Sequence, residues 1–153
     1  MGAQLAGAFL AVLSFGILLE VPKKHMLKAG AVGTTCWLVY LLLIRQEFTV
    51  IMATFLASLV ISVLGHIGAR VFKAPVTVFL IPGIFPLVPG ASIYRCVAYL
   101  IQSDMQLANH YLTEAIQISG AIALAIFITD SIFKVWQKGK RRRALIKAKT
   151  ADS

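Results

Sequence analysis

Arg95 stands in an apolar stretch of the sequence, directly after a segment rich in proline and glycine. An arginine in such a position is costly unless its guanidinium reaches water, a carboxylate or unpaired backbone carbonyls. A helix that starts at Gly90 would present free N–H groups and a positive dipole end to the same place, Ser92 would cap that end, and Tyr94 would offer a hydroxyl. We therefore predict that Gly90, Ser92, Tyr94 and Arg95 bind a carboxylate. The alternative is that Arg95 reaches the membrane interface or braces the carbonyls of the preceding break.

The break itself divides the apolar segment Pro75–Ile101. It contains Pro82, Gly83, Pro86 and Pro89. Prolines at spacings of four and three do not fit one regular helix, because each removes an N–H and clashes with the preceding turn. In lipid, unpaired backbone is tolerated only where protein buries it or where it lines a polar cavity, and broken helices of this kind hold solute sites in transporters. We expect two half-helices, 75–81 and 90–101, around an irregular link.

Two further polar side chains are candidates for proton coupling. Asp130 lies near the end of the last apolar run, and intramembrane carboxylates form proton relays in transporters. The alternative is an ordinary ion pair with Lys134, four residues on. His66 can change charge near neutral pH, but a histidine this close to an interface can equally be a hydrogen-bonded boundary residue.

Other kinds of chemistry have no motif in the sequence. Cys36 and Cys96 are single cysteines in separate apolar runs, with no metal-ligand spacing, so we expect small core residues, no metal site and no cofactor. There is no HExxH, no Ser/His/Asp set, no paired carboxylates and no ATP-binding loop in a run. The sequence therefore argues against an intramembrane enzyme and against a primary pump.

The composition places the chain in a membrane. Apolar residues make up 59% of the 153 residues and charged residues only 14%, and the mean hydropathy is +0.84. The apolar residues form five runs, each near the length that a helix needs to cross the bilayer. These runs are Ala3–Leu19, Leu27–Ile44, Phe48–Ala69, Pro75–Ile101 and Thr113–Phe133. We predict an all-α membrane protein of about five transmembrane helices, the fourth discontinuous, with a membrane domain at 1–137 and a basic tail at 138–153.

The net charge of +9 follows the loops in alternation. Basic residues gather between the first and second runs, between the third and fourth, and after the fifth, whereas the other two loops are balanced or acidic through Asp104 and Glu114. Because Lys and Arg stay on the cytoplasmic side, this pattern predicts an outside N-terminus and a cytoplasmic C-terminus. It also favours a fourth segment that crosses over one that re-enters. The basic tail next to a membrane helix suits the lipid surface and needs no nucleic acid partner.

Two segments carry a resemblance to a known family. The string Thr54-Phe55-Leu56-Ala57-Ser58 and the stretch Pro82–Arg95, which reads PGIFPLVPGASIYR, resemble the threonine/serine exporter (ThrE) family, specifically its short subunit. The EVPKK at Glu20–Lys24 agrees with this. The resemblance implies proton-driven export of small hydroxy amino acids or other small carboxylates across a bacterial-type cell membrane. It also implies a longer ThrE-type partner subunit.

Two interpretations of the function remain at this stage. In the first, the chain is an exporter subunit whose broken helix holds the substrate carboxylate. In the second, it is a structural or assembly subunit, and the broken helix only packs against the partner. Five short helices make a thin bundle with few side chains to enclose a solute path, so both interpretations include a partner.

Overall fold

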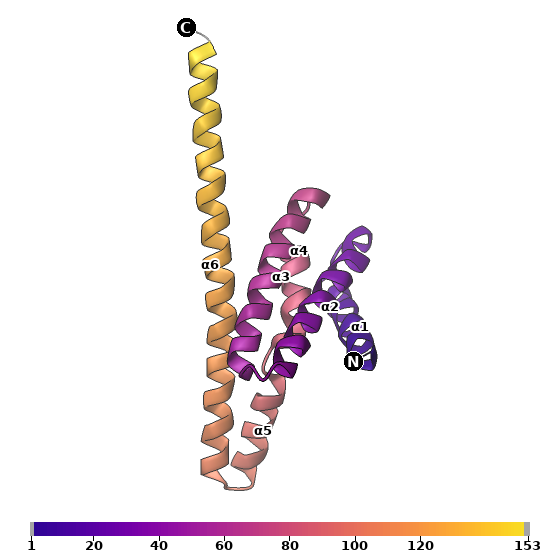
Figure 1. Cartoon of the computed structure of the whole chain (residues 1–153). Helices are drawn as coiled ribbons and strands as arrows, with labels where there is room; N and C mark the ends of the chain where they lie inside the picture. The colour runs from indigo at the N-terminus through magenta and orange to yellow at the C-terminus, as the bar shows by residue number, and fades with distance from the viewer. Residues whose placement is uncertain (1, 152–153) are drawn as a thin grey trace.

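The structure is a computed structural model that describes the backbone of residues 2–151 and the side chains of residues 2–139. Its described part consists of helices and has no strand. The elements are α1 (Gly2–Leu18), α2 (Lys23–Arg45), α3 (Val50–Phe72), α4 (Thr77–Ile84), the short 3-10 helix η1 (Phe85–Leu87), α5 (Gly90–Ile101) and α6 (Met105–Ala151). Helices α1 to α4 run alternately up and down, α5 continues in the direction of α4, and the long α6 stands along one side (Figure 1). Most of the predicted basic tail lies outside the residues whose side chains are described.

Three helices are long and apolar enough to cross a membrane within the described residues. They are α2, α3 and the segment Met105–Gly139 of α6, and the bent pair Thr77–Leu87 and Gly90–Ile101 makes a fourth if it forms one span. The helix α1 is apolar but has only 17 residues. The all-helical membrane architecture predicted from the sequence is thus confirmed, whereas the count of five crossings stays a prediction.

Helix α3 lies at the centre of the molecule and packs against α2, α4 and α6. A buried cluster of Cys36, Ala57, Ile61 and Leu87 joins α2, α3 and η1. The Cys36 thiol donates to the Ala57 carbonyl at 3.3 Å. The two cysteines are buried and free, as the sequence indicates.

The fourth segment is more helical than the sequence suggests. The helix α4 continues through Pro82 to Ile84, and η1 follows it directly, so only Val88 and Pro89 separate the two parts. The sequence predicts an irregular link over residues 82–89, which is longer than the two-residue link in the structure. The two parts meet at an angle of 45°. Pro82 fits because only the carbonyl one turn before it loses a donor, a local cost that a buried helix can accommodate.

Close contact between α2 and α4 fixes the position of this break. A Cβ atom on Gly33 would lie 2.9 Å from the Gly83 Cα and 2.6 Å from Val12 Cγ2. Two glycines thus let the two backbones approach, which is the usual basis of helix packing in lipid. The chain that follows Gly83 is held against α2 as a result.

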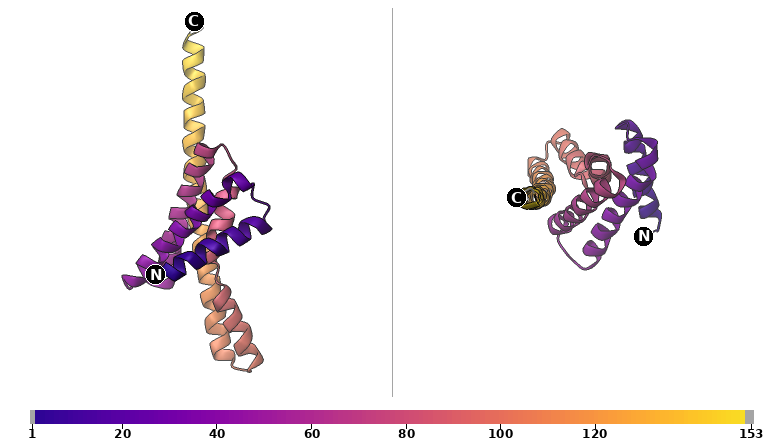
Figure 2. Two further views of the ribbon diagram at one scale, coloured as in Figure 1. Left: turned by 90° about the vertical axis from the view of Figure 1, so that its right-hand side faces the viewer. Right: turned by 90° about the horizontal axis from the view of Figure 1, so that it is seen from above.

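Helices α5 and α6 form a hairpin that projects beyond the other helices (Figure 2). The turn at residues 102–104 is short, and Asp104 Oδ1 accepts the Leu107 N–H at 3.1 Å at the start of α6. Because α6 begins at Met105 rather than near Thr113, Glu114 lies inside a helix and not in a loop. The expectation that Glu114 contributes to an acidic loop is corrected by this placement.

Candidate functional site

A pocket of about 260 Å³ lies where α4 and α5 are interrupted. Four helices and the interrupted segment contribute to its wall, but α1 does not. The lining residues are Trp37, Tyr40, Val50, Thr54, Pro86, Leu87, Val88, Pro89, Ala91, Ser92, Arg95, Glu114 and Ile118. The interruption predicted from the prolines therefore lies at a cavity.

Two opposite charges line this pocket. Arg95 comes from α5 and is exposed, and Glu114 comes from α6 and is partly buried. Ser92 is 8% exposed, and its hydroxyl donates to Glu114 Oε2 at 3.1 Å. No ion pair joins Arg95 to Glu114 within the described part of the chain. The guanidinium of Arg95 lies instead 5.5 Å from the ring centre of Tyr111.

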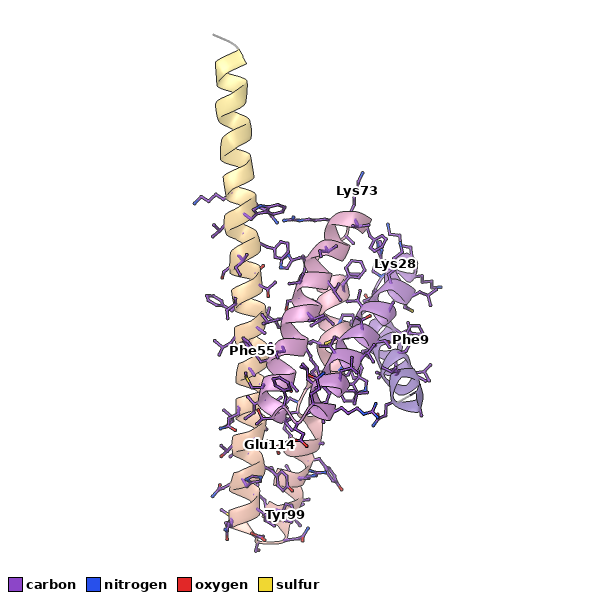
Figure 3. All side chains as sticks on the ribbon, viewed as in Figure 1. Phe9, Lys28, Phe55, Lys73, Tyr99 and Glu114 are labelled. Carbon is purple, nitrogen blue, oxygen red and sulfur yellow. The ribbon has the colours of Figure 1, made fainter. Side chains whose placement is uncertain are left out.

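The pocket also has hydrogen-bonding groups that the sequence did not single out. Tyr40 stacks on Trp37, with ring centres 5.0 Å apart, and Thr54 is 2% exposed at the start of α3. Glu114 is the most consequential of the residues missed (Figure 3). The signal was present, because Glu114 is the second residue of the apolar run Thr113–Phe133 and so could already belong to the helix.

The structure separates the predicted substrate residues into two groups. Ser92 and Arg95 line the pocket, whereas Tyr94 is 74% exposed and lies outside the lining. Gly90 lies next to the lining residues Pro89 and Ala91, and its N–H donates to the Val88 carbonyl at 2.7 Å. That N–H is therefore already engaged, and the Ser92 hydroxyl is directed to Glu114 rather than to the helix end.

The four predicted break residues also divide. Pro86 and Pro89 line the pocket. Pro82 and Gly83 are buried inside α4, one turn earlier. Pro86 and Pro89 therefore shape the pocket wall, whereas Pro82 and Gly83 position the segment against α2.

A second polar cluster lies between α3 and α6, further toward the C-terminal end of both. His66 Nε2 lies 3.6 Å from Asp130 Oδ1, and Lys134 Nζ lies 2.5 Å from Asp130 Oδ2. The imidazole of His66 stacks on Phe133 of α6 with ring centres 4.2 Å apart, and Arg70, also from α3, lies over the same ring. The two residues that the sequence suggested separately for proton coupling are thus brought into contact. The ion pair of Asp130 with Lys134, the alternative interpretation, is present as well.

The described residues contain no group of three or more His, Cys, Asp or Glu side chains placed to hold an ion. The polar groups near the pocket can instead form hydrogen bonds and ion pairs with an organic solute. A guanidinium and a carboxylate on opposite helices are suited to a ligand that carries both charges.

Comparison with known proteins identifies a family for most of the chain. The family model described as "Threonine/Serine exporter, ThrE" matches residues 4–132. That range contains the pocket, the interrupted segment and the His66–Asp130 pair. Neither a curated protein nor a solved structure gives a significant match.

Proposed function

The chain belongs to the threonine/serine exporter family, and we propose that it is a subunit of a proton-coupled secondary exporter that binds its substrate in the pocket at the interrupted helix. The family is one of membrane transporters rather than of enzymes. The observation that carries the proposal is the presence of Arg95 and Glu114 in one cavity without an ion pair between them.

A zwitterionic amino acid would satisfy both charges. Its carboxylate would pair with the Arg95 guanidinium, whose planar fork suits two oxygens, and its ammonium would pair with Glu114. A hydroxyl on the substrate would find Tyr40, Thr54 or Ser92 as a hydrogen-bonding partner. These contacts favour threonine or serine over a small carboxylate without an amino group.

Proton coupling would use the His66–Asp130 pair. A histidine and a carboxylate in contact can share a proton, and ionisable groups in transmembrane helices mark such relays. The pair lies on α3 and α6, the same two helices that bring Thr54 and Glu114 to the pocket. One pair of helices would therefore link the two sites.

We propose that the bent pair α4 and α5 forms one broken span. The angle of 45° supports this, because a re-entrant loop would need to reverse direction whereas α5 continues the course of α4 (Figure 1). By the positive-inside rule, the N-terminus lies outside and the C-terminus in the cytoplasm.

A longer ThrE-type subunit is the partner that we propose. The hairpin of α5 and α6 extends beyond the other helices and carries exposed apolar and aromatic side chains, among them Ile93, Tyr94 and Ile116. Arg95 is also exposed, so the pocket has an open side. A partner helix laid along the hairpin would close the pocket and cover these side chains.

The second candidate function, an assembly subunit without a substrate site, has one observation in its favour. The Arg95 guanidinium already lies over Tyr111, which gives it a structural partner within the hairpin. In that case the arginine would hold α5 against α6, and the substrate would bind in the partner chain.

Transport by reconstituted protein tests the proposal. The assembly purified from its native membrane, placed in vesicles loaded with labelled threonine, should release threonine faster when a pH gradient is imposed. Vesicles that contain this chain alone should release no more than empty vesicles. An efflux rate that does not change with the pH gradient would contradict proton coupling. Clear efflux from the chain alone would contradict the need for a partner.

A further inference from the structure

A stripe of polar side chains runs along α3 from the pocket to the His66–Asp130 pair. Its members are Thr54, Ser58, Ser62 and His66, each four residues after the one before. Residues at this spacing are neighbours on one side of a helix. All four are buried, with exposed fractions of 2%, 0%, 1% and 8% in that order. Thr54 lines the pocket and His66 contacts Asp130, so the stripe begins at one site and ends at the other.

The two serines in the middle of the stripe have unpartnered hydroxyls. Ser58 Oγ and Ser62 Oγ are buried and have no hydrogen-bond partner in the described structure. Threonines elsewhere in the helices behave differently. Thr34 donates to the Gly30 carbonyl at 2.8 Å and Thr129 to the Ala125 carbonyl at 2.9 Å, each within its own helix.

Packing alone does not explain these serines. A buried hydroxyl without a partner is costly, and alanine would give the same close helix contact without that cost. We therefore infer that water is the hydrogen-bond partner of these two hydroxyls. Consecutive members of the stripe are separated by a rise of about 6 Å along the helix axis. One water that makes two hydrogen bonds of about 2.8 Å spans nearly that distance.

We propose that Ser58 and Ser62, with bridging waters, form a proton relay between the His66–Asp130 pair and Glu114. The inference rests on the proposed proton-coupled export. A hydroxyl both donates and accepts, so each can pass one proton on while it receives another. Export driven by the proton gradient moves protons inward, so a proton from outside first binds the Glu114 carboxylate. Along the relay the Glu114 carboxyl group then gives up one proton, the serines and waters are unchanged at the end, and the His66–Asp130 pair gains one proton.

The protonation of Glu114 that precedes this step releases the substrate. A protonated Glu114 no longer attracts the substrate ammonium, so proton arrival and substrate departure are linked at one side chain. The charged and titratable groups that face the two ends of the relay are Arg70 and Lys134 near His66, and Arg95 and Tyr40 near Glu114. The cations would favour release of a proton from the pair.

The double variant Ser58→Ala, Ser62→Ala tests the relay in the native assembly. In proteoliposomes, proton movement driven by a threonine gradient, read by an internal pH dye, should fall about tenfold or more, because each lost hydrogen bond raises the barrier to proton transfer. One-for-one exchange of labelled for unlabelled threonine moves no net proton and should keep its rate. Thr34→Val, which removes a hydroxyl already bonded within its own helix, should leave both rates unchanged.

The outcomes separate the relay from the proposed function. Unchanged proton movement in the double variant, with coupled transport intact in the wild type, would overturn the relay alone. Net threonine transport down its gradient without proton movement in the wild type would overturn proton coupling and the relay together. If the double variant assembles in low yield, the two single variants give the same comparison per assembled complex.

Discussion

Arg95 and Glu114 have opposite charges and different surroundings. Glu114 is partly buried and accepts a hydrogen bond from Ser92, so its carboxylate is held in place. Arg95 is exposed and contacts a tyrosine ring. The proposed function depends on whether each of these two charged side chains binds the substrate or only stabilises the protein.

Substitution of Arg95 separates these roles. The Arg95→Lys variant keeps the charge but loses the planar fork for two carboxylate oxygens, so it should slow export per assembled complex. Arg95→Gln should slow it further, with a normal yield of complex. The measurement is threonine efflux from proteoliposomes, normalised to the complex present. Normal efflux per complex together with a poor yield would assign Arg95 to assembly instead.

Substitution of Glu114 tests recognition of the ammonium. Threonine and 3-hydroxybutyrate differ by that amino group, so the wild type should prefer threonine. In Glu114→Gln, threonine affinity should fall by roughly tenfold or more, the usual scale for a lost hydrogen bond to a charged group, while 3-hydroxybutyrate loses little. Competition binding to the purified assembly measures both. Glu47→Gln, an exposed carboxylate in the α2–α3 loop, is the control and should change neither.

The element that matters most is the interrupted pair α4 and α5. Its prolines do not all act alike, because Pro82 lies within a helix whereas Pro89 lies at the interruption. The contact of Gly33 with Gly83 places the segment against α2 and so fixes where the pocket wall runs. Packing of the two helices is therefore a condition for the site.

Enlargement of Gly33 should destabilise the fold. In Gly33→Ala, the new methyl group would meet the Gly83 backbone, and relief of such overpacking typically costs about 1–3 kcal/mol. The temperature at which half of the detergent-purified protein remains monodisperse should fall by several degrees. Gly120→Ala is the matched control, because nothing lies within 4 Å of its added Cβ, and its midpoint should not fall. Equal midpoints for the two variants would contradict the close approach of α2 and α4.

The molecule as a whole has a basic end. Lys28 and Lys73 lie together at one end of the bundle, and the part of α6 that holds Lys134 runs toward the same end (Figure 3). The α5–α6 turn lies at the opposite end (Figure 1). Positive charges at one end, read with the positive-inside rule, support the proposed orientation.

Accessibility of single cysteines tests that orientation. In a background where the buried Cys36 and Cys96 are replaced by alanine, Gln106→Cys should react with a membrane-impermeant maleimide in intact cells. Lys138→Cys should react only after permeabilisation. If Lys138→Cys reacts in intact cells and Gln106→Cys only after permeabilisation, either the pair α4 and α5 re-enters instead of crossing or the whole topology is inverted. If both positions need permeabilisation, the segment Met105–Gly139 does not cross the membrane.

Several features followed from the sequence because they depend on local chemistry. The apolar runs required helices, since a chain in lipid must satisfy its backbone internally, and the family match agrees with the motif around Pro82–Arg95. The prolines indicated a break, although its extent was overestimated, because one proline inside a buried helix costs only a local hydrogen bond.

Only the tertiary structure brought distant residues together. Glu114 is 22 positions from Ser92, yet the short α5–α6 turn folds one helix back on the other and joins the two side chains. His66 and Asp130 also come from distant parts of the chain. They meet because α6 is long enough to pack along α3. The sequence by itself determined the class of protein and the place of the break, since composition and proline content act along the chain. Which polar groups share a pocket was decided by helix packing, which depends on contacts between segments that the linear pattern does not specify.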